Sequence, residues 1–306
     1  MKKTHSVNKL ISVALSLFLT ACNSQHSIDA EQENWLSLFN GKDLTGWDIK
    51  FAGLPINENY LETFVVEDNM IRIKYDNYKN FNNAFGHLYY KTPFSYYKLT
   101  FDYRFTGEQM EGGAVWNERN SGVMLHAQSA QSNELTQNFP MSIELQILGG
   151  LNDGKERSTG NVCTPGTAVE MNKKVNYKHC IPSASKTYHG DQWVQGEAIV
   201  MGGESMVFNI EGETVLSFQK PQFDGAFVSK SDKDKDWEMA GMSRDIEMWK
   251  NKSGQLLSEG YIALQAESHA VDFKNIKLLN LVGCMDSNAS NYKSYYVKDN
   301  NQSCIY

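Results

Sequence analysis

Three short segments of this chain carry the residue types best suited to chemistry. In the first, residues 142–147, apolar side chains alternate with Ser142, Glu144 and Gln146. Successive side chains of a β-strand point to opposite faces, so the alternation places Glu144 beside Gln146 on one polar face. A carboxylate and an amide held on a rigid strand can bind sugar hydroxyls, and the carboxylate can also move a proton. The same alternation is equally typical of a solvent-exposed sheet face without function.

The second segment combines a polar cluster with a histidine. Arg119, Asn120 and Ser121 precede a strand predicted at 123–127, and this strand carries His126. The unperturbed pKa of histidine suits proton transfer near neutral pH. His126 is therefore a candidate for catalysis, although a single histidine is more often a structural hydrogen-bonding group.

The third segment lies between two predicted strands, where strand ends and loops commonly build sites. Gln265, Glu267 and His269 share one parity in this segment. If they lie near the first two segments, two carboxylates and two histidines come together. Such a set could act as acid and base or supply three ligands to a metal. The spacing leaves both readings open, so no cofactor is assigned and a divalent metal stays an option.

Motifs and charge exclude several common functions. The chain contains no GxSxG elbow, P-loop, dinucleotide fingerprint or HExxH motif. Its formal net charge is −7 and its pI is about 5.6. A nucleic-acid-binding surface needs clustered basic residues, which this sequence lacks.

Short alternating segments dominate the body of the chain. In the segment 97–105, Leu99, Phe101, Tyr103 and Phe105 share one face and polar residues the other. Comparable runs occur at residues 70–74, 122–126, 142–148, 197–200, 206–210, 214–218, 261–266 and 271–279. Gly, Asn and Asp turns separate these runs, and long amphipathic helices are hard to find. The pattern predicts an all-β protein, a two-sheet β-sandwich of the jelly-roll kind.

The segment 230–252 breaks this pattern. It is charged and alternates poorly, which predicts a long loop with a short helix at 242–249. Trp237 and Trp249 either line a lid or pack the segment down onto the body, and the second reading is slightly favoured.

Five cysteines bear on the compartment. Cys22 belongs to the N-terminal segment, which leaves Cys163, Cys180, Cys284 and Cys304. An even number in an oxidising compartment predicts two disulfides. Of the three pairings, sequence neighbourhood favours Cys163 with Cys180 and Cys284 with Cys304. A zinc site is the rival for the first pair because a histidine precedes Cys180, but no paired Cys-x-x-Cys knuckle is present.

The N-terminus has the layout of a bacterial lipoprotein signal peptide. A basic start leads into an apolar run, 10–19, and then Leu19-Thr20-Ala21-Cys22. The run is shorter than the roughly 20 apolar residues of a transmembrane helix. We expect a signal peptide at 1–21 and a lipidated Cys22 that anchors the protein to the membrane. Asn23 favours the outer membrane, on its periplasmic or cell-surface face, and residues 22–34 form a polar tether.

The amino-acid composition changes near residue 281, which predicts two folded parts, a body at 35–281 and a small tail at 282–306. The tail is rich in Asn, Ser and Tyr and is bounded by Cys284 and Cys304. It resembles a short cysteine-bounded module found at the ends of many secreted proteins of Bacteroidetes-type bacteria. A segment of this size depends on its disulfide. Its polar side chains could bind calcium, but a stapled spacer is the favoured reading. The calcium candidates are Asp286, Asn288, Asp299 and Asn300.

Five blocks of the body, in the right order, resemble the 3-keto-disaccharide hydrolase family. They are LFNGKDLTGW at 38–47, RNSGVMLHAQS at 119–129, FPMSIELQILGG at 139–150, GDQWVQGEAIV at 190–200 and GYIALQAESHAVDFKNIKLLNL at 260–281. The resemblance covers roughly residues 35–281. It implies a concanavalin-like, or laminarinase-like, jelly roll.

The resemblance also implies a reaction. The substrate is a disaccharide or other glycoside whose sugar carries a ketone at carbon 3, made by an upstream sugar oxidoreductase. The ketone acidifies the hydrogen on carbon 2, so a base removes it, the aglycone leaves from carbon 1, and water later adds to the enone. This route differs from the oxocarbenium route of ordinary glycosidases. A metal ion or aligned donors would stabilise the enolate oxygen.

Site roles follow from the same resemblance. By motif match, Asn120, Ser121, Glu144 and Gln146 fall on the family's concave polar rows, and Gln265 and His269 on its late strand pair. The hypothesis makes Glu144 the base or a ligand and gives proton transfer to His126 or His269. The proposed substrate-binding residues are Arg119, Asn120, Ser121, Gln146, Gln265 and Glu267.

Two other functions compete with this one. A cell-envelope lipoprotein that binds glycans without cleaving them would share every feature except turnover, because the fold does not fix the function. Ordinary laminarinase-type hydrolysis is disfavoured. It needs paired acidic residues on one strand, whereas Glu144 is followed by Gln146.

Overall fold

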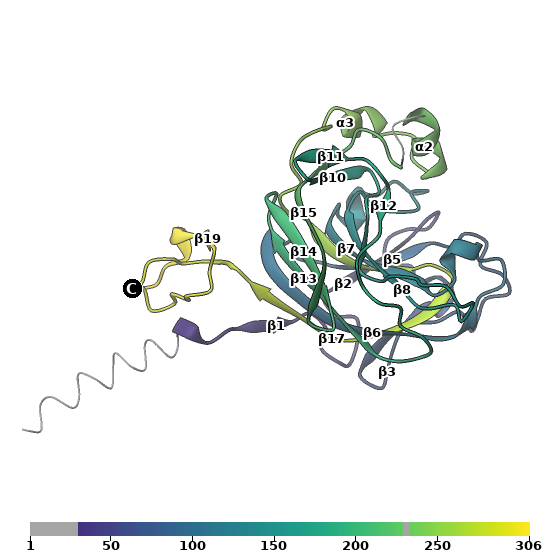
Figure 1. The fold of residues 1–306 in the computed structure, drawn as a ribbon, viewed down its shortest axis with the longest axis horizontal. Coiled ribbons are helices and arrows are strands. Elements are labelled where there is room, and N and C mark those ends of the chain that lie inside the picture. The colour runs from purple at the N-terminus through teal and green to yellow at the C-terminus, as the bar shows by residue number, and fades with distance from the viewer. Residues whose placement is uncertain (1–29, 229–232) are drawn as a thin grey trace, which may run out of the picture. The chain divides into compact units, whose positions relative to one another are not determined.

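The structure is a computed structural model that describes residues 30–228 and 233–306. It divides into two compact units, 35–280 and a small unit of 281–306 with the end of the N-terminal segment. The predicted signal peptide and the lipidated Cys22 lie outside the described residues. Among the described residues, no helix is long and apolar enough to span a membrane. Figure 1 shows that the larger unit is built almost entirely of strands.

Two antiparallel sheets form the larger unit (Figure 1). The first sheet has ten strands, in the order β11 (Lys174–Asn176), β10 (Thr167–Met171), β15 (Glu213–Phe223), β14 (Ser205–Ile210), β13 (Val194–Met201), β6 (Tyr96–Gln109), β17 (His269–Asn280), β4 (Met70–Ile73) and β3 (Phe64–Glu67), with β1 (Trp35–Ser37) paired to β17. The second has seven, in the order β12 (Cys180–Ile181), β9 (Asn161–Cys163), β8 (Ile143–Leu148), β7 (Asn120–Ala127), β16 (Tyr261–Ala266), β5 (Gly86–Tyr90) and β2 (Trp47–Phe51).

One continuous core joins the inner faces of the two sheets. Phe101 and Phe273 contribute from the first sheet, and their ring centroids lie 6.2 Å apart. Val123, Leu145 and Leu264 contribute from the second, and all are fully buried. Period-two alternation then turns the residues between them to the outer face of each sheet. The predicted jelly-roll β-sandwich is therefore confirmed.

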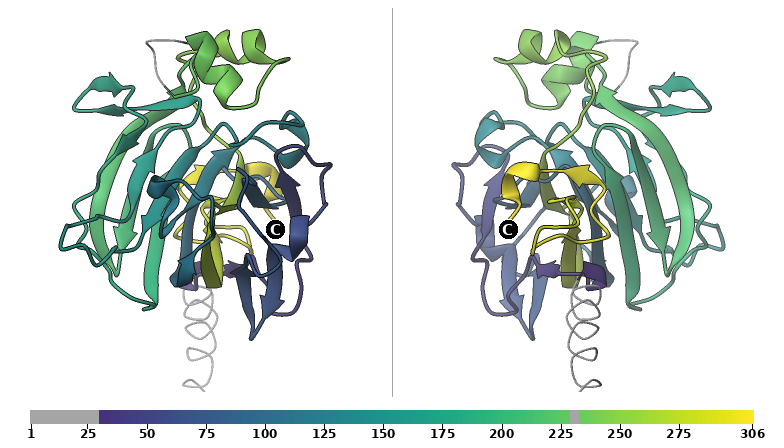
Figure 2. Two further views of the ribbon diagram at one scale, coloured as in Figure 1. Left: turned by 90° about the vertical axis from the view of Figure 1, so that its right-hand side faces the viewer. Right: turned by 90° about the vertical axis from the view of Figure 1, so that its left-hand side faces the viewer.

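The segment predicted as a loop with one helix contains two short helices. They are α2 (Lys233–Met239) and α3 (Ile246–Lys250), and Figure 2 shows them together at one end of the unit. Trp237 and Trp249 are buried in a small apolar cluster with Met141 and Phe227. Both tryptophans therefore pack the segment down, as the favoured reading expected.

Both predicted disulfides are present. Cys163 of β9 bonds Cys180 of β12, which is its partner in the strand pair. This bond removes the sulfur ligands that a zinc site would need. Cys284 bonds Cys304 in the small unit.

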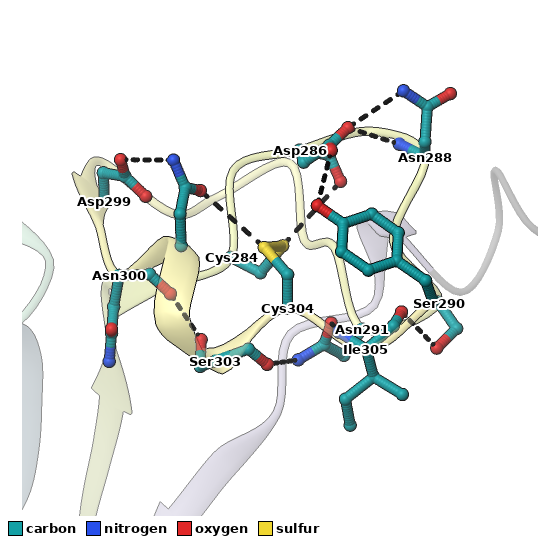
Figure 3. The surroundings of a disulfide bond; sticks show 12 residues. Cys284, Asp286, Asn288, Ser290, Asn291, Asp299, Asn300, Ser303, Cys304 and Ile305 are labelled. Atoms are coloured by element: carbon teal, nitrogen blue, oxygen red, sulfur yellow. Dashed lines mark hydrogen bonds between the residues drawn. A yellow bond between two sulfur atoms is a disulfide. The ribbon is translucent and has the colours of Figure 1, made fainter.

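The small unit is a disulfide-bonded set of turns with two short parallel strands, β18 (Val282–Gly283) and β19 (Lys298–Asp299). Figure 3 shows polar side chains hydrogen-bonded to one another around the disulfide. The Asp286 carboxylate accepts from the Asn288 backbone N–H at 2.9 Å and from the Tyr306 hydroxyl at 2.8 Å. Asp299 Oδ2 accepts from the Asn301 amide at 2.6 Å. These carboxylates accept hydrogen bonds that stabilise turns of the small unit.

Candidate active site

A row of polar residues crosses the outer face of the second sheet. Lys50 of β2 pairs with His87 of β5, and His87 pairs with Gln265 of β16. Gln146 of β8 pairs with Gly122 of β7 and with Asn161 of β9. Leu264 pairs with Val123 in the adjoining strands, which brings Gln265 beside Gly122. The complete row consists of Lys50, His87, Gln265, Gly122, Gln146 and Asn161.

Gly122 is the gap in this row, and the side chain of Glu144 fills it. A Cβ atom placed on Gly122 would lie 2.3 Å from Glu144 Oε1 and 2.7 Å from Glu144 Cγ. Any larger residue at 122 would therefore displace the carboxyl group. The absence of a side chain at Gly122 lets Glu144 lie in the row between Gln146 and Gln265.

Glu144 and Glu267 form a buried carboxyl pair. Burial raises the pKa of Glu144 to about 8. Burial and then the charge of Glu144 raise the pKa of Glu267 well above its usual range. Two carboxyl groups that oppose each other's ionisation titrate in sequence and share one proton over the pH range between the two steps. The pair can therefore present one base and one acid to the same ligand.

His87 and Lys50 continue the site on the other side of Gln265. Burial and then the charge of Lys50 lower the pKa of His87 to about 3, so this imidazole is neutral. Lys50 Nζ donates to the backbone oxygens of Phe51 at 2.5 Å and Leu135 at 3.0 Å. Burial lowers its pKa to about 8. The ring atom His87 Nε2 is buried and has no hydrogen-bond partner among the described residues.

Buried amide oxygens on β16, on β7 and on the turn before β7 also lack partners in the described structure. Within the described part of the chain, Gln265 Oε1, Asn117 Oδ1 and Asn120 Oδ1 accept no hydrogen bond. Gln146 Oε1, by contrast, accepts from Asn161 Nδ2 at 3.0 Å. A buried polar atom without a partner costs about 1–3 kcal/mol. A concentration of such atoms at one place is expected where a polar ligand supplies the missing partners.

Two of the predicted residues on β7 lie elsewhere. The Ser121 hydroxyl is fully buried and donates to the backbone oxygen of Gln265 at 2.8 Å. The His126 ring lies 3.0 Å from the backbone oxygen of Leu257 and 3.3 Å from that of Ser95. It also packs against Tyr97, a core residue of β6. These contacts give both side chains structural partners and separate them from the polar row.

His126 reaches the core side because β7 is irregular at this point. The backbone of His126 has φ of +48°, and the pairing of β7 with β16 shifts register there. Strict alternation along the strand would have kept its side chain in phase with Gly122. Burial lowers the pKa of His126 to about 4, so its ring is neutral at physiological pH.

Arg119 and His269 lie together, against Phe105 of the core. The Arg119 guanidinium is 5.6 Å from the centre of the Phe105 ring, and the His269 ring meets that ring edge-on at 5.7 Å. Arg119 also pairs with Asp191 at 3.5 Å and donates to the backbone oxygen of Gly190. Burial and the charge of Arg119 lower the pKa of His269 to about 4. This arrangement places both residues against a core ring of β6, whereas Glu144 lies on the outer face of the second sheet. Both ring nitrogens of His269 and Arg119 Nε are buried without a hydrogen-bond partner among the described residues.

The structure thus brings together five of the predicted site residues and separates four. Those at the carboxyl pair, in the polar row, or two residues before its Gly122 on β7 are Glu144, Gln146, Gln265, Glu267 and Asn120. Those apart from it are Arg119, Ser121, His126 and His269.

Sequence reasoning missed Lys50, His87 and Asn161. The first two lie in the five-residue segments WDIKF and GHLYY, where polar and apolar residues alternate. That alternation was the available signal, but a five-residue segment gives few repeats. Asn161 lies in a three-residue strand, and no periodicity can be read there.

The donor set does not resemble a metal centre. Among the described residues, no group of three or more His, Cys, Asp and Glu side chains is placed to hold a metal ion. The pair offers two carboxyl groups, and the polar atoms beside it come from amides and from one imidazole. The chemistry below is therefore derived from these protein groups alone.

Comparison with known proteins identifies the family to which this chain belongs. The family model described as the 3-keto-alpha-glucoside-1,2-lyase-like domain matches residues 34–279. The chain belongs to this family, and it is a glycoside hydrolase-like protein with a sugar as its expected ligand. No curated protein matches it significantly.

Three bacterial proteins are among the solved structures of similar fold. One from Parabacteroides distasonis, provisionally described as a glycosyl hydrolase, is 15% identical, covers 81% of this chain and 99% of its own, and has a TM-score of 0.47. A second from the same organism is 22% identical, with 84% and 96% covered and a TM-score of 0.45. A galectin-like protein of unknown function from Bacillus subtilis is 12% identical, with 81% and 97% covered and a TM-score of 0.41.

Proposed function

We propose that this protein cleaves the glycosidic bond of 3-keto-glycosides by elimination followed by hydration. The observation that carries the proposal is the buried carboxyl pair Glu144 and Glu267, set among unpartnered polar atoms in a domain of the matching family. A pair that shares one proton supplies the base and the acid that this reaction needs at adjacent carbons.

In the elimination step, Glu144 acts as the base and Glu267 as the acid. Glu144 ionises first, because its charge is what raises the pKa of Glu267 further. Ionised Glu144 removes the proton from carbon 2 to give an enolate with its negative charge on the keto oxygen, and the enolate electrons then form the carbon 1–carbon 2 double bond. The bond from carbon 1 to the glycosidic oxygen breaks, and protonated Glu267 gives its proton to the departing oxygen.

Neutral donors in the polar row stabilise the negative charge on the keto oxygen. His87 is uncharged, and its unpartnered Nε2 donates when the ring hydrogen is on that atom. The Gln265 amide lies beside it in the row. Donors fixed before the reaction stabilise a developing oxyanion without having to reorganise.

Hydration of the enone then restores the protonation states of the two carboxyl groups. Glu267, now ionised, takes a proton from water as the water oxygen bonds carbon 1 of the enone. Glu144, now protonated, returns a proton to carbon 2. The products are the free 3-keto sugar and the aglycone, and both carboxyl groups end in their starting states.

The test measures cleavage of the glycosidic bond and exchange of the hydrogen on carbon 2 in the same reaction. Purified protein from Asn23 onward is incubated with a 3-keto disaccharide and with the same unoxidised disaccharide, in D2O. We expect cleavage of the keto form alone, with transient enone absorbance and one deuterium at carbon 2 of the product. Glu144→Gln should abolish both signals. Equal cleavage of both disaccharides without deuterium would identify an ordinary glycosidase instead.

Binding without turnover is the second candidate function. The unpartnered amide oxygens of the site would serve a glycan-binding protein equally well. In that case every glycoside in the same test remains intact, while calorimetry detects binding. The buried carboxyl pair favours the enzyme, because a binding site gains little from two groups that resist ionisation together.

The proposal extends to the cellular location. The N-terminal sequence supports an outer membrane lipoprotein anchored at Cys22, on the periplasmic or surface face. Its substrate would then be supplied by a sugar oxidoreductase that forms the ketone. Labelling of cells with an alkynyl fatty acid should mark the protein, and Cys22→Ala should remove the label. Full labelling of that variant would refute the anchor.

A further inference from the structure

We propose that Trp116 is a stacking surface for the aglycone, so that this site selects glycosides whose leaving group is itself a ring. The inference rests on the proposed function, because it places the departing half of the substrate relative to the carboxyl pair. It concerns a residue that does no chemistry and that neither the family match nor the sequence pattern assigns.

Trp116 is a largely exposed tryptophan that stacks on a buried ring. It lies on the short 3-10 helix η2 (Val115–Asn117), which precedes β7, and 55% of its side chain is exposed. Its ring is parallel to that of buried Phe85, with an interplanar angle of 11° and 6.3 Å between centroids. A tryptophan held parallel to a buried ring while half of it faces solvent is suited to stack a further flat-faced group.

A line of aromatic rings connects Trp116 to the polar row. The Phe85 ring lies 4.8 Å from that of Phe139, and Phe139 lies 6.1 Å from His87. Phe85 comes directly before β5, in which Gly86 pairs with Ala266. Continuing that register places Phe85 beside Glu267. Trp116 therefore stacks on the ring next to the proposed acid.

Hydrogen bonds fix the turn that carries Trp116. Gln109 Nε2 donates to the backbone oxygen of Ala114 at 2.8 Å and to the hydroxyl of Ser268 at 3.0 Å. Asn120 Nδ2 donates to the backbone oxygen of Trp116 at 3.1 Å. Gln109 thus bridges the turn to the residue after Glu267, and the first residue of β7 bonds the turn directly. A ring fixed in this way loses little conformational freedom when a ligand binds.

The direction of the reaction decides which half of the substrate meets Trp116. The acid must reach the glycosidic oxygen, so the aglycone lies on the Glu267 side of the bond and the keto sugar on the Glu144 side. The ring next to Glu267 is Phe85, and the exposed ring stacked on it is Trp116. The indole face then packs against the C–H face of a pyranose or against an aryl ring, but a methyl group would leave it uncovered.

The test compares a 3-keto disaccharide with the 3-keto methyl glycoside of the same sugar. For Trp116→Ala we expect KM for the disaccharide to rise about tenfold with kcat nearly unchanged, and KM for the methyl glycoside to stay within twofold. Trp116→Phe should restore most of the loss. Val115→Ala, on the same turn and 83% exposed, is the matched control and should leave both substrates unaffected.

A binding arm separates this inference from the proposed reaction. Calorimetry with the Glu144→Gln protein measures the affinity of disaccharide and methyl glycoside, with and without Trp116→Ala. Selective loss of disaccharide affinity supports the stacking surface even if no substrate is turned over. An equal loss for both ligands, or none for the disaccharide, overturns it, and an unchanged melting temperature shows that the variant is folded.

Discussion

At the scale of the residue, the carboxyl pair would let the proposed ketone-dependent reaction proceed without two independent acidic residues on one strand. Glu144 is the second residue of β8, and Glu267 lies just beyond the end of β16. Their shared environment raises both pKa values, which keeps an acid available at a pH where an isolated glutamate would be fully ionised. Gly122 makes this possible by leaving the space that Glu144 occupies.

The first prediction concerns the separate roles of the two carboxyl groups. The kcat/KM for a 3-keto disaccharide should rise with pH as Glu144, whose pKa is about 8, ionises. It should fall at higher pH, where Glu267 loses its proton. Glu267→Gln should lower kcat about 10²- to 10⁴-fold and remove the alkaline limb of the profile. A 3-keto glycoside with a nitrophenol leaving group should largely rescue Glu267→Gln, but not Glu144→Gln. Rescue of both variants would contradict this assignment.

The second prediction is that Glu144→Gln stabilises the fold. A carboxyl group with a folded pKa above its unfolded value contributes its stability below the unfolded pKa and loses it as pH rises through the folded one. The wild-type protein therefore loses stability between about pH 4.5 and 8, and an uncharged glutamine does not. We expect Glu144→Gln to raise the melting temperature at pH 8 by a few degrees, and by less at pH 5. Scanning calorimetry at both pH values measures this. A variant less stable at pH 8 would contradict the prediction.

At the scale of the element, a buried carboxylate of the loop 128–140 accepts several hydrogen bonds from the α2–α3 segment. Glu134 accepts from the backbone N–H groups of three successive residues at the start of α3. The donors are Ser243 at 2.9 Å, Arg244 at 3.0 Å and Asp245 at 3.1 Å. Burial opposes ionisation of Glu134, but these hydrogen bonds outweigh it and lower its pKa. An anion at a helix N-terminus is also favoured by the helix dipole.

The third prediction tests this contact. Glu134→Gln keeps one acceptor oxygen but loses the charge, and charge-assisted hydrogen bonds contribute about 1.5–3 kcal/mol. We expect the Ser243–Asp245 amides to exchange with solvent at least tenfold faster, with little change in the core strands. Arg244→Ala removes only an exposed side chain 3.6 Å from the same carboxylate and serves as the control. If both variants behave alike, a surface ion pair holds the segment instead.

The strands also show what alternation can and cannot predict. The segment 97–105 was predicted as one strand and forms the centre of β6, because its apolar face is buried along its whole length. Register between strands is not encoded in alternation, so the row from Lys50 to Asn161 was visible only in the fold. A positive φ at His126 turns its side chain away from the face that strict alternation with Gly122 would give. This local irregularity brings the His126 ring to backbone oxygens of Leu257 and Ser95.

At the scale of the whole molecule, the family match and the fold agree on where the enzyme unit ends. The match ends at residue 279, and the larger unit ends at Asn280. The Cys163–Cys180 disulfide lies within that unit, and Cys284–Cys304 lies within the small one. Each unit thus carries its own covalent link, and the site uses residues of the larger unit alone.

The last prediction follows from this division. A chain that ends at Asn280 should keep kcat and KM for the 3-keto disaccharide, and its main melting transition should shift by no more than about 2 °C. The reason is that the larger unit has its own continuous core, whereas a segment as small as 281–306 depends on its disulfide. Calorimetry and steady-state kinetics of the truncated and full chains measure both quantities. Breaking the other disulfide with Cys163→Ser and Cys180→Ser is the matched comparison, and it should cost about 2–4 kcal/mol of unfolding free energy. A truncated chain that loses activity while its melting transition is unchanged would show that the small unit takes part in catalysis.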